Sequence, residues 1–193
     1  GGGSGGSIYL TAGTLAGEGA YSANGGPGAA SRVAGGGRMA LVATNAGANF
    51  DALILEDLQV KGGTYPSSPN SSGGSGTIYL QSWYDKPGRG TVRVANFNRT
   101  GNPVTEVGYT TYAVPGEADR AVFRVRDGAK MRMLNDFMVG DIWLETANAV
   151  LDLGGYTLTV RSREHPLGPG SVQNYGQIIW LPEIPRGTVY FAK

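Results

Sequence analysis

The chain has 193 residues, of which 40% are hydrophobic, enough to bury a continuous apolar core. Sixteen basic and fifteen acidic residues leave a net charge of +1 without a cluster of either sign, so no nucleic acid partner is predicted. The absence of cysteine excludes disulfides and thiolate metal sites, and no apolar run reaches the ~20 residues of a membrane-spanning helix, so no membrane insertion is predicted in this segment.

The chain opens on a glycine-rich run, GGGSGGS at 1–7, that has neither the basic nor the apolar region of a signal peptide. An expression linker is one interpretation of this run. However, it passes directly into Ile8-Tyr9-Leu10, and nearly the same phrase returns as GGSGTIYL at 73–80. A repeat inside the chain favours a native segment within a longer sequence. Glycine makes up 33 of the 193 residues, which favours turns and close backbone contacts over long helices.

Apolar residues alternate with a period of two in short pieces, separated by clusters of Gly, Asn, Pro and Ser. This pattern predicts an all-β protein with strands of four to five residues, and at most a short turn or helix within 52–60. The predicted strands, in chain order, are 8–10, 39–42, 54–55, 77–80, 91–94, 121–125, 131–134, 141–144, 150–153, 157–160, 177–181 and 188–191.

A triplet of isoleucine, an aromatic residue and leucine occurs four times, at 8–10, 78–80, 142–144 and 179–181. The triplets are 70, 64 and 37 residues apart, close to multiples of a coil of about 20 residues with loops of varied length inserted. Side chains alternate across a strand, so we expect each Ile and Leu to face inward and each aromatic residue to face outward.

Two segments carry a family resemblance. The segment 150–160, VLDLGGYTLTV, resembles a rung of autotransporter passenger domains and related bacterial surface β-helices. Residues 1–42, with SGGSIYLTAGTLAGEGAYSANGGPG followed by GGGRMALVA, resemble the glycine-rich repeats of very large exported β-helical proteins of environmental bacteria. The resemblance covers a little over a third of the chain and implies a fold without a catalytic signature.

Strand pattern, repeats and resemblance together predict a right-handed parallel β-helix, or β-solenoid, with inserted loops. A β-sandwich or jelly roll in the second half is the alternative, and it would pair its strands antiparallel. We expect glycine-rich rungs over 1–50, irregular rungs with loop insertions over 51–120, and regular rungs over 121–193 that continue the first part.

No catalytic, cofactor-binding or metal-ligating residue is predicted, and the chain is not expected to be an enzyme. The single histidine, His165, lies beside Glu164 in a Pro- and Gly-rich segment typical of a solvated loop. Four carboxylates in adjacent predicted strands, Asp136, Asp141, Glu145 and Asp152, could line one face as in glycan-cleaving enzymes. Outward polar positions of alternating strands explain them better.

The aromatic residues form the candidate surface for a ligand or partner: Tyr9, Tyr79, Trp83, Tyr84, Trp143 and Trp180. Aromatic side chains on a flat face can bind sugar rings or pack against another subunit, and covering the core is the alternative. Four arginines on neighbouring strands, Arg93, Arg124, Arg126 and Arg132, could likewise meet an acidic polymer, or form a solvated polar face.

The function expected from these features is a structural or adhesive module of a secreted or cell-surface bacterial protein. Neighbouring repeats or further copies of the chain are the predicted partners, because a stack of coils leaves open edges at both ends and can grow into a filament. The alternative is a carbohydrate-binding or polysaccharide-cleaving β-helix with a glycan as ligand.

Overall fold

The structure, a computed structural model, describes residues 2–28, 33–65, 68–98, 104–107, 120–162 and 164–182. Within these ranges the chain forms β-strands and one 3-10 turn, Leu55–Asp57, and has no α-helix. The strands are β1 Ser7–Ala12, β2 Tyr21–Ser22, β3 Arg38–Ala43, β4 Leu58–Gln59, β5 Thr64–Tyr65, β6 Ser68–Ser72, β7 Thr77–Gln81, β8 Thr91–Ala95, β9 Val104–Val107, β10 Val122–Arg126, β11 Lys130–Met133, β12 Phe137–Val139, β13 Asp141–Leu144, β14 Val150–Asp152, β15 Thr157–Val160, β16 Ser171–Gln173 and β17 Gln177–Trp180. The all-β prediction is therefore confirmed.

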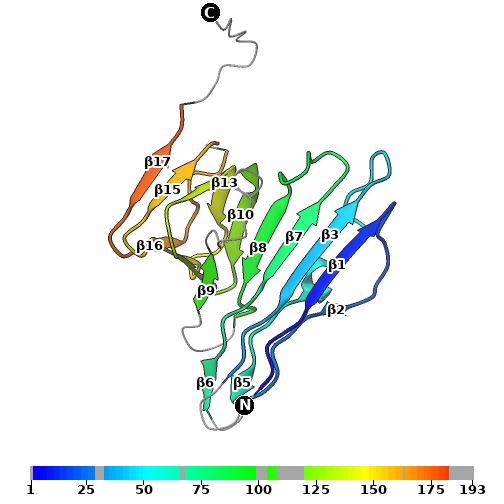
Figure 1. The fold of residues 1–193 in the computed structure, drawn as a ribbon, viewed down its shortest axis with the longest axis horizontal. Helices are drawn as coiled ribbons and strands as arrows, with labels where there is room; N and C mark the ends of the chain where they lie inside the picture. The colour runs from blue at the N-terminus through cyan, green and yellow to red at the C-terminus, as the bar shows by residue number, and fades with distance from the viewer. Residues whose placement is uncertain are drawn as a thin grey trace, which may run out of the picture.

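The strands form three larger sheets, which are mostly parallel (Figure 1). The first has six strands in the order β1-β3-β7-β8-β10-β13, the second four in the order β16-β14-β11-β9, and the third three in the order β12-β15-β17. Within these sheets every described pair is parallel except β7 with β8. Two small two-stranded pairs, β2 with β4 and β5 with β6, lie beside them.

In the second half, consecutive strands along the chain fall into different sheets, and each sheet gains one strand per pass. From β10 onwards, residues that pair across neighbouring strands are 19 to 21 positions apart, as in Val122 with Asp141, Phe137 with Leu158, and Val150 with Ser171. The pairs of β8 with β10 and of β9 with β11 have longer offsets, 31 and 26 positions. The period of about 20 residues expected from the triplets is therefore found only from β10 onwards. The first two triplets are linked through β3 at offsets of 31 and 39 positions, and the fourth lies in a different sheet from the other three. The antiparallel pairing required by a β-sandwich is not found among the described strands β8 to β17.

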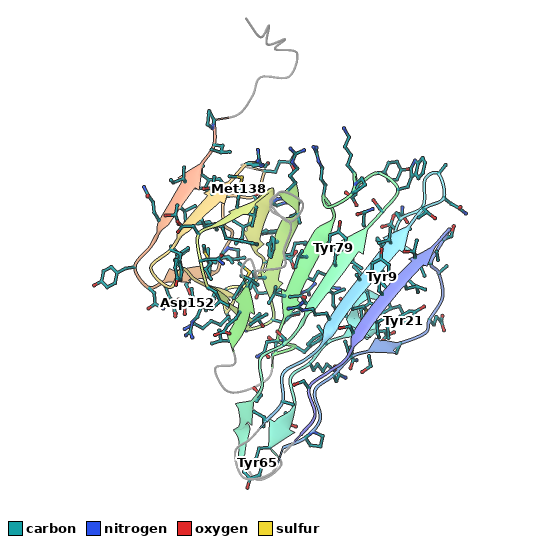
Figure 2. The ribbon with its side chains drawn as sticks, viewed as in Figure 1. Tyr9, Tyr21, Tyr65, Tyr79, Met138 and Asp152 are labelled. Carbon is teal, nitrogen blue, oxygen red and sulfur yellow. The ribbon has the colours of Figure 1, made fainter. Side chains whose placement is uncertain are left out.

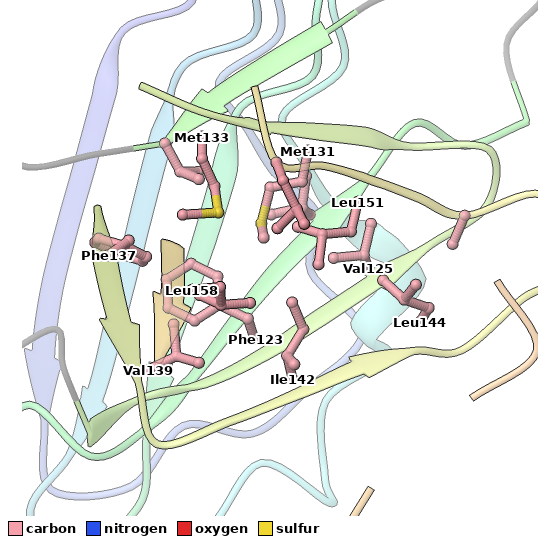
Figure 3. Packing of buried hydrophobic residues seen from close by; sticks show 14 of the residues in the cluster. Phe123, Val125, Met131, Met133, Phe137, Val139, Ile142, Leu144, Leu151 and Leu158 are labelled. Atoms are coloured by element: carbon pink, nitrogen blue, oxygen red, sulfur yellow. The ribbon is translucent and has the colours of Figure 1, made fainter. Parts of the chain in front are cut away.

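The larger core lies between the three sheets of the second half. Figure 3 shows Phe123 of β10, Met131 of β11 and Leu158 of β15 pointing into one interior from three directions. Phe123 meets Phe137 edge to face, with ring centroids 5.6 Å apart. Side chains point alternately to the two faces of each short strand, so every second residue faces inward and contributes an apolar side chain to this core.

The first half combines a smaller core with stacked glycine backbones. Its core contains Met39, Leu41, Ile78 and Leu80, which face the same side of β3 and β7. Below these strands, glycine-rich segments run side by side and bond through their backbones, as Gly36 N–H does to Gly74 O at 2.9 Å. At several of these glycines, such as Gly36 and Gly76, the contacts leave no room for a side chain.

The two cores lie on opposite faces of the six-stranded sheet. β7 and β8 pair antiparallel, and this pairing sets Tyr79 opposite Val92 and Ile78 opposite Arg93. Ile78 belongs to the smaller core, whereas Val92 packs against the larger one. Because paired residues project from the same face of a sheet, the face that Tyr79 presents to solvent in the first half becomes the buried face in the second.

Candidate ligand surface

Tyr9 and Tyr79 lie on the same outer face of the six-stranded sheet, one on either side of Ala40 (Figure 2). Parallel pairing places Tyr9 beside Ala40 and Ala40 beside Tyr79, so the two tyrosine backbones are about 10 Å apart at the usual strand spacing. Tyr9 is 75% exposed. The small side chain of Ala40 leaves the space between the two rings open.

A hollow of about 430 Å³ opens at this point of the sheet. Tyr9, Val42 and Tyr79 come from the first half, while Val92 and Ala121 come from strands or turns next to the larger core. Gln81, the last residue of β7, also lines the hollow, and the loop after this strand adds Pro87 and Gly88. The hollow therefore lies where the outer face of the first half meets the end of the second.

The Tyr79 ring is fixed within this hollow by its hydroxyl group. The hydroxyl donates to Oε1 of Gln81 at 2.8 Å and accepts from the backbone N–H of Gly90 at 3.2 Å. Oε1 of Gln81 also accepts from the backbone N–H of Gly88 at 3.2 Å. The amide oxygen of Gln81 is thus engaged twice, which leaves its NH₂ group as the amide donor able to meet a ligand.

A second hollow of about 200 Å³ continues the first along β3 and β7. The two share Val42 and Gln81, and the second ends at Trp83, which is 52% exposed. Asp85 lies beside Trp83, and its Oδ2 accepts from the backbone N–H and the hydroxyl of Ser82 at 2.9 and 2.8 Å. We refer to the two hollows together as the aromatic groove.

Three of the six predicted aromatic site residues, Tyr9, Tyr79 and Trp83, thus meet in the aromatic groove, and the other three do not line it. Tyr84 is exposed at the tip of the same loop, and Trp143 projects from the outer face of β13. The expected orientation holds for the first three triplets but is wrong for Trp180. Trp180 packs against the larger core, and its neighbour Ile179 is exposed instead.

Trp143 is the centre of a stacked row on the outer face of the second half. The imidazole of His165 stacks on the indole of Trp143, with ring centroids 4.6 Å apart. The guanidinium of Arg124, a residue of β10, lies 4.9 Å from the centre of the same indole. Arg124 also pairs with Glu145. These two contacts cover part of the Trp143 indole, which leaves less of its surface for a ligand.

His165 is held by a carboxylate that sequence reasoning did not connect with it. Its Nδ1 lies 2.7 Å from Oδ2 of Asp141, whose side chain is 2% exposed and whose Oδ1 accepts from the N–H of Ile142. Glu164 completes a group whose ligand atoms lie within 4.8 Å of one another, a spacing that a divalent cation could use. Asp141 and His165 are 24 residues apart, close to one coil, which is the only signal in the sequence that links them.

The four carboxylates considered for catalysis do not line one face. Asp141 and Glu145 lie on or just after β13, whereas Asp152 lies on β14 in another sheet. Asp136 accepts from the backbone N–H of Thr157 at 2.8 Å. The four carboxylates are therefore divided between two sheets and the turns beside them, and do not form the single row that one face would give.

The carboxylate of Asp152 is buried and bonded to several groups within the chain. Its Oδ2 accepts a hydrogen bond from Nε of Arg132 at 3.0 Å and forms an ion pair with Nζ of Lys130 at 3.2 Å. Its Oδ1 accepts from the side-chain amide of Asn174 and from the backbone N–H of Gly154, the latter at 3.1 Å. Burial of the carboxyl group opposes ionisation, but the hydrogen bonds from Asn174, Arg132 and Lys130 outweigh this and lower the pKa of Asp152 to about 2.

The four arginines likewise do not form one free cationic surface. Arg93 is buried, donates to Leu55 O at 3.0 Å, and has its pKa lowered chiefly by that burial. Arg124 and Arg126 both approach Glu145, and Arg132 pairs with Asp152. The acidic-polymer interpretation loses its main support, because the described guanidinium groups have partners within the chain.

No helix in the described part of the chain has the length and apolar character needed to cross a membrane. Comparison with family models, with curated protein sequences and with solved structures finds no match to this chain.

Proposed function

We propose that this chain is a structural module of a longer right-handed parallel β-helix, and that the parent protein is secreted or attached to a cell surface. In this proposal the coils hold the outer faces in a fixed array and do no chemistry themselves. Neighbouring repeats, or further copies of the chain, stack on the two ends. The repeat of 19 to 21 residues between paired strands from β10 onwards supports this interpretation.

The observation that carries the proposal is the exposure of inward positions at both ends of the stack. Val172 of β16 pairs with Leu151 of β14, yet Leu151 is fully buried and Val172 is 40% exposed. At the other end, Ile8 and Leu10 of β1 are exposed more than their partners in β3. A further coil at each end would cover these side chains.

The free edge of β1 allows a direct test. Gly6 and Ala12 accept hydrogen bonds from β3, at Arg38 N and Thr44 N, so the even-numbered residues of this strand face β3. Thr11 therefore directs its N–H to the edge that no described strand covers. Replacement of Thr11 by proline removes that donor without breaking the pairing with β3.

We expect the unaltered chain to form elongated oligomers whose mass rises with concentration, and Thr11→Pro to shift the population towards monomer. Thr11→Val, which keeps the N–H group, is the matched control and should associate as the unaltered chain does. Light scattering coupled to size exclusion measures the masses, and negative-stain microscopy shows the shapes. An unaltered chain that stays monomeric at millimolar concentration would contradict end-to-end stacking.

A further inference from the structure

We propose that the aromatic groove binds a neutral oligosaccharide, with Tyr9, Tyr79 and Trp83 as the contacts for its sugar rings. The groove lies on the outer face of the sheet and is complete within one chain, and Tyr9, although it belongs to the edge strand β1, projects from that face and not from the edge on which a further strand would pair. Its ligand therefore does not depend on the stacking proposed above, and each proposal can fail alone.

The lining of the groove has the mixed character that a sugar requires. A pyranose ring presents apolar C–H faces and a rim of hydroxyl groups, so it needs aromatic faces beside hydrogen-bonding groups. Tyr9 and Trp83 offer exposed aromatic surface, and Gln81 between them offers its NH₂ group. An apolar peptide would leave this amide without a partner.

The spacing of the aromatic side chains favours more than one sugar ring. Tyr9 and Tyr79 are separated by the width of two strands across the sheet, and Trp83 follows Tyr79 beyond the end of β7. The two hollows meet at Val42 and Gln81, so the contacts form one continuous path. A chain of several sugars can follow this path, while a single sugar would contact one part of it.

The charge of the groove favours a neutral ligand over an acidic one. None of the described residues lining the larger hollow is charged, and the one charged group among those lining the smaller hollow is the carboxylate of Asp85. A polysaccharide rich in carboxylate or sulfate would find no basic side chain among these described lining residues and would be repelled by Asp85.

The groove is also largely pre-formed. Hydrogen bonds to Gly90 and Gln81 fix the Tyr79 hydroxyl, and the Gly88 N–H fixes the Gln81 amide. The side chain of Asp85 accepts two hydrogen bonds from Ser82, and these close the short turn that contains Trp83. Groups that are ordered before binding lose less conformational freedom when the ligand arrives, so a shallow surface can still bind.

The test is calorimetric titration of the full chain with a panel of neutral hexasaccharides, made of glucose, mannose, xylose or N-acetylglucosamine units, and with hexagalacturonate as the acidic probe. We expect at least one neutral member to bind at micromolar to millimolar concentration. Tyr9→Ala and Trp83→Ala should each weaken it about tenfold, the effect of losing one aromatic contact. Tyr9→Phe, which keeps the ring, should retain the affinity.

Tyr175→Ala is the matched control, because Tyr175 is 95% exposed in the turn between β16 and β17 and lies outside the groove. It should bind as the unaltered chain does. The proposal is overturned if no neutral hexasaccharide binds at millimolar concentration or if hexagalacturonate binds more tightly. It is also overturned if affinity survives both Tyr9→Ala and Trp83→Ala. Oligomer mass, measured in parallel, reports separately on end-to-end stacking.

Discussion

Several glycine residues in the first half are needed because a side chain at their positions would collide with a neighbouring backbone segment. A Cβ atom on Gly37 would lie 1.9 Å from Gly6 O, and one on Gly36 would lie 1.9 Å from Val60 O. Neighbouring backbone segments therefore approach each other more closely than any other residue type allows. Gly35, in the same run of three, has only an ordinary contact at 3.7 Å.

This difference between adjacent glycines gives a prediction at the scale of the residue. Gly37→Ala should destabilise the protein by about 3 kcal/mol or more, because the backbone of the neighbouring segment must move. Gly35→Ala should change the free energy of unfolding by less than about 1 kcal/mol, and the loss of unfolded-state freedom should make it slightly stabilising. Urea unfolding of both variants measures the difference, and equal effects would contradict the close packing.

Asp152 gives a prediction that depends on pH. Its pKa falls from 3.8 to about 2 on folding, so its contribution to stability is present above pH 4 and is lost as the pH falls towards 2. Asp152→Asn leaves Arg132 and Lys130 without their carboxylate and should cost about 2 kcal/mol at pH 7.

The difference in stability between the unaltered chain and Asp152→Asn should therefore shrink as the pH is lowered from 4 to 2. Urea unfolding at several pH values measures it. A difference that stays constant over this interval would show that the carboxylate is not the origin of the effect.

At the scale of the strand, inward positions that pair with each other contribute differently to stability in neighbouring strands of one sheet. Leu151 of β14 and Val172 of β16 pair with each other, but only Leu151 is enclosed by strands on both sides. Leu151→Ala should cost about 3 kcal/mol in the free energy of unfolding, and Val172→Ala under about 1 kcal/mol. Calorimetry of the two variants compares them, and similar losses would mean that β16 is as enclosed as β14.

The strands that the sequence predicts well are those with a clear alternation of apolar and polar residues. Thr77 to Leu80 and Thr157 to Val160 are examples, since each has two inward positions that reach the core. The short strands β2, β4, β5, β12 and β16 were missed, because two or three residues show no period. The longer strands β6 and β9 were missed as well, and the predicted strand 54–55 is wrong, because the 3-10 turn begins there at Leu55. The predicted strand 188–191 lies outside the described residues.

Trp180 shows why the direction of a side chain is harder to predict than its strand. Ile178 and Ile179 are both apolar, so the alternation can be read in either phase, and a shift of one residue exchanges the two faces. The aromatic triplet favoured the wrong phase. In the structure Ile178 and Trp180 face the core, and Ile179 is exposed.

The candidate site was predictable only in part, because its members meet through the register of distant strands. Aromatic residues between inward-facing neighbours pointed to Tyr9 and Tyr79, but only pairing through Ala40 places them side by side. The contribution of Val92 and Ala121 depends on the antiparallel pairing of β7 with β8, for which the loop between these strands carries no signal.

At the scale of the whole molecule, the six-stranded sheet is the element that both cores share. β1 lies at one side of the molecule and β17 at the other, as Figure 1 shows, and the chain reverses its direction once between them within this sheet. The larger core packs on one face of the sheet, and the smaller core packs on the opposite face. Each half therefore keeps its own apolar interior.

This arrangement determines how the protein would respond to mechanical load. A pull applied across the sheet, from β1 towards β13, passes through the pairing of β7 with β8, which is described by three residue pairs, against six for β1 with β3. That seam is the shortest ladder in the sheet, so we expect the two halves to separate there first, once the hydrogen bonds of Arg93 to Leu55 O and of Thr105 to Ser75 O have broken. The junction that builds the aromatic groove would then also serve as an extensible joint.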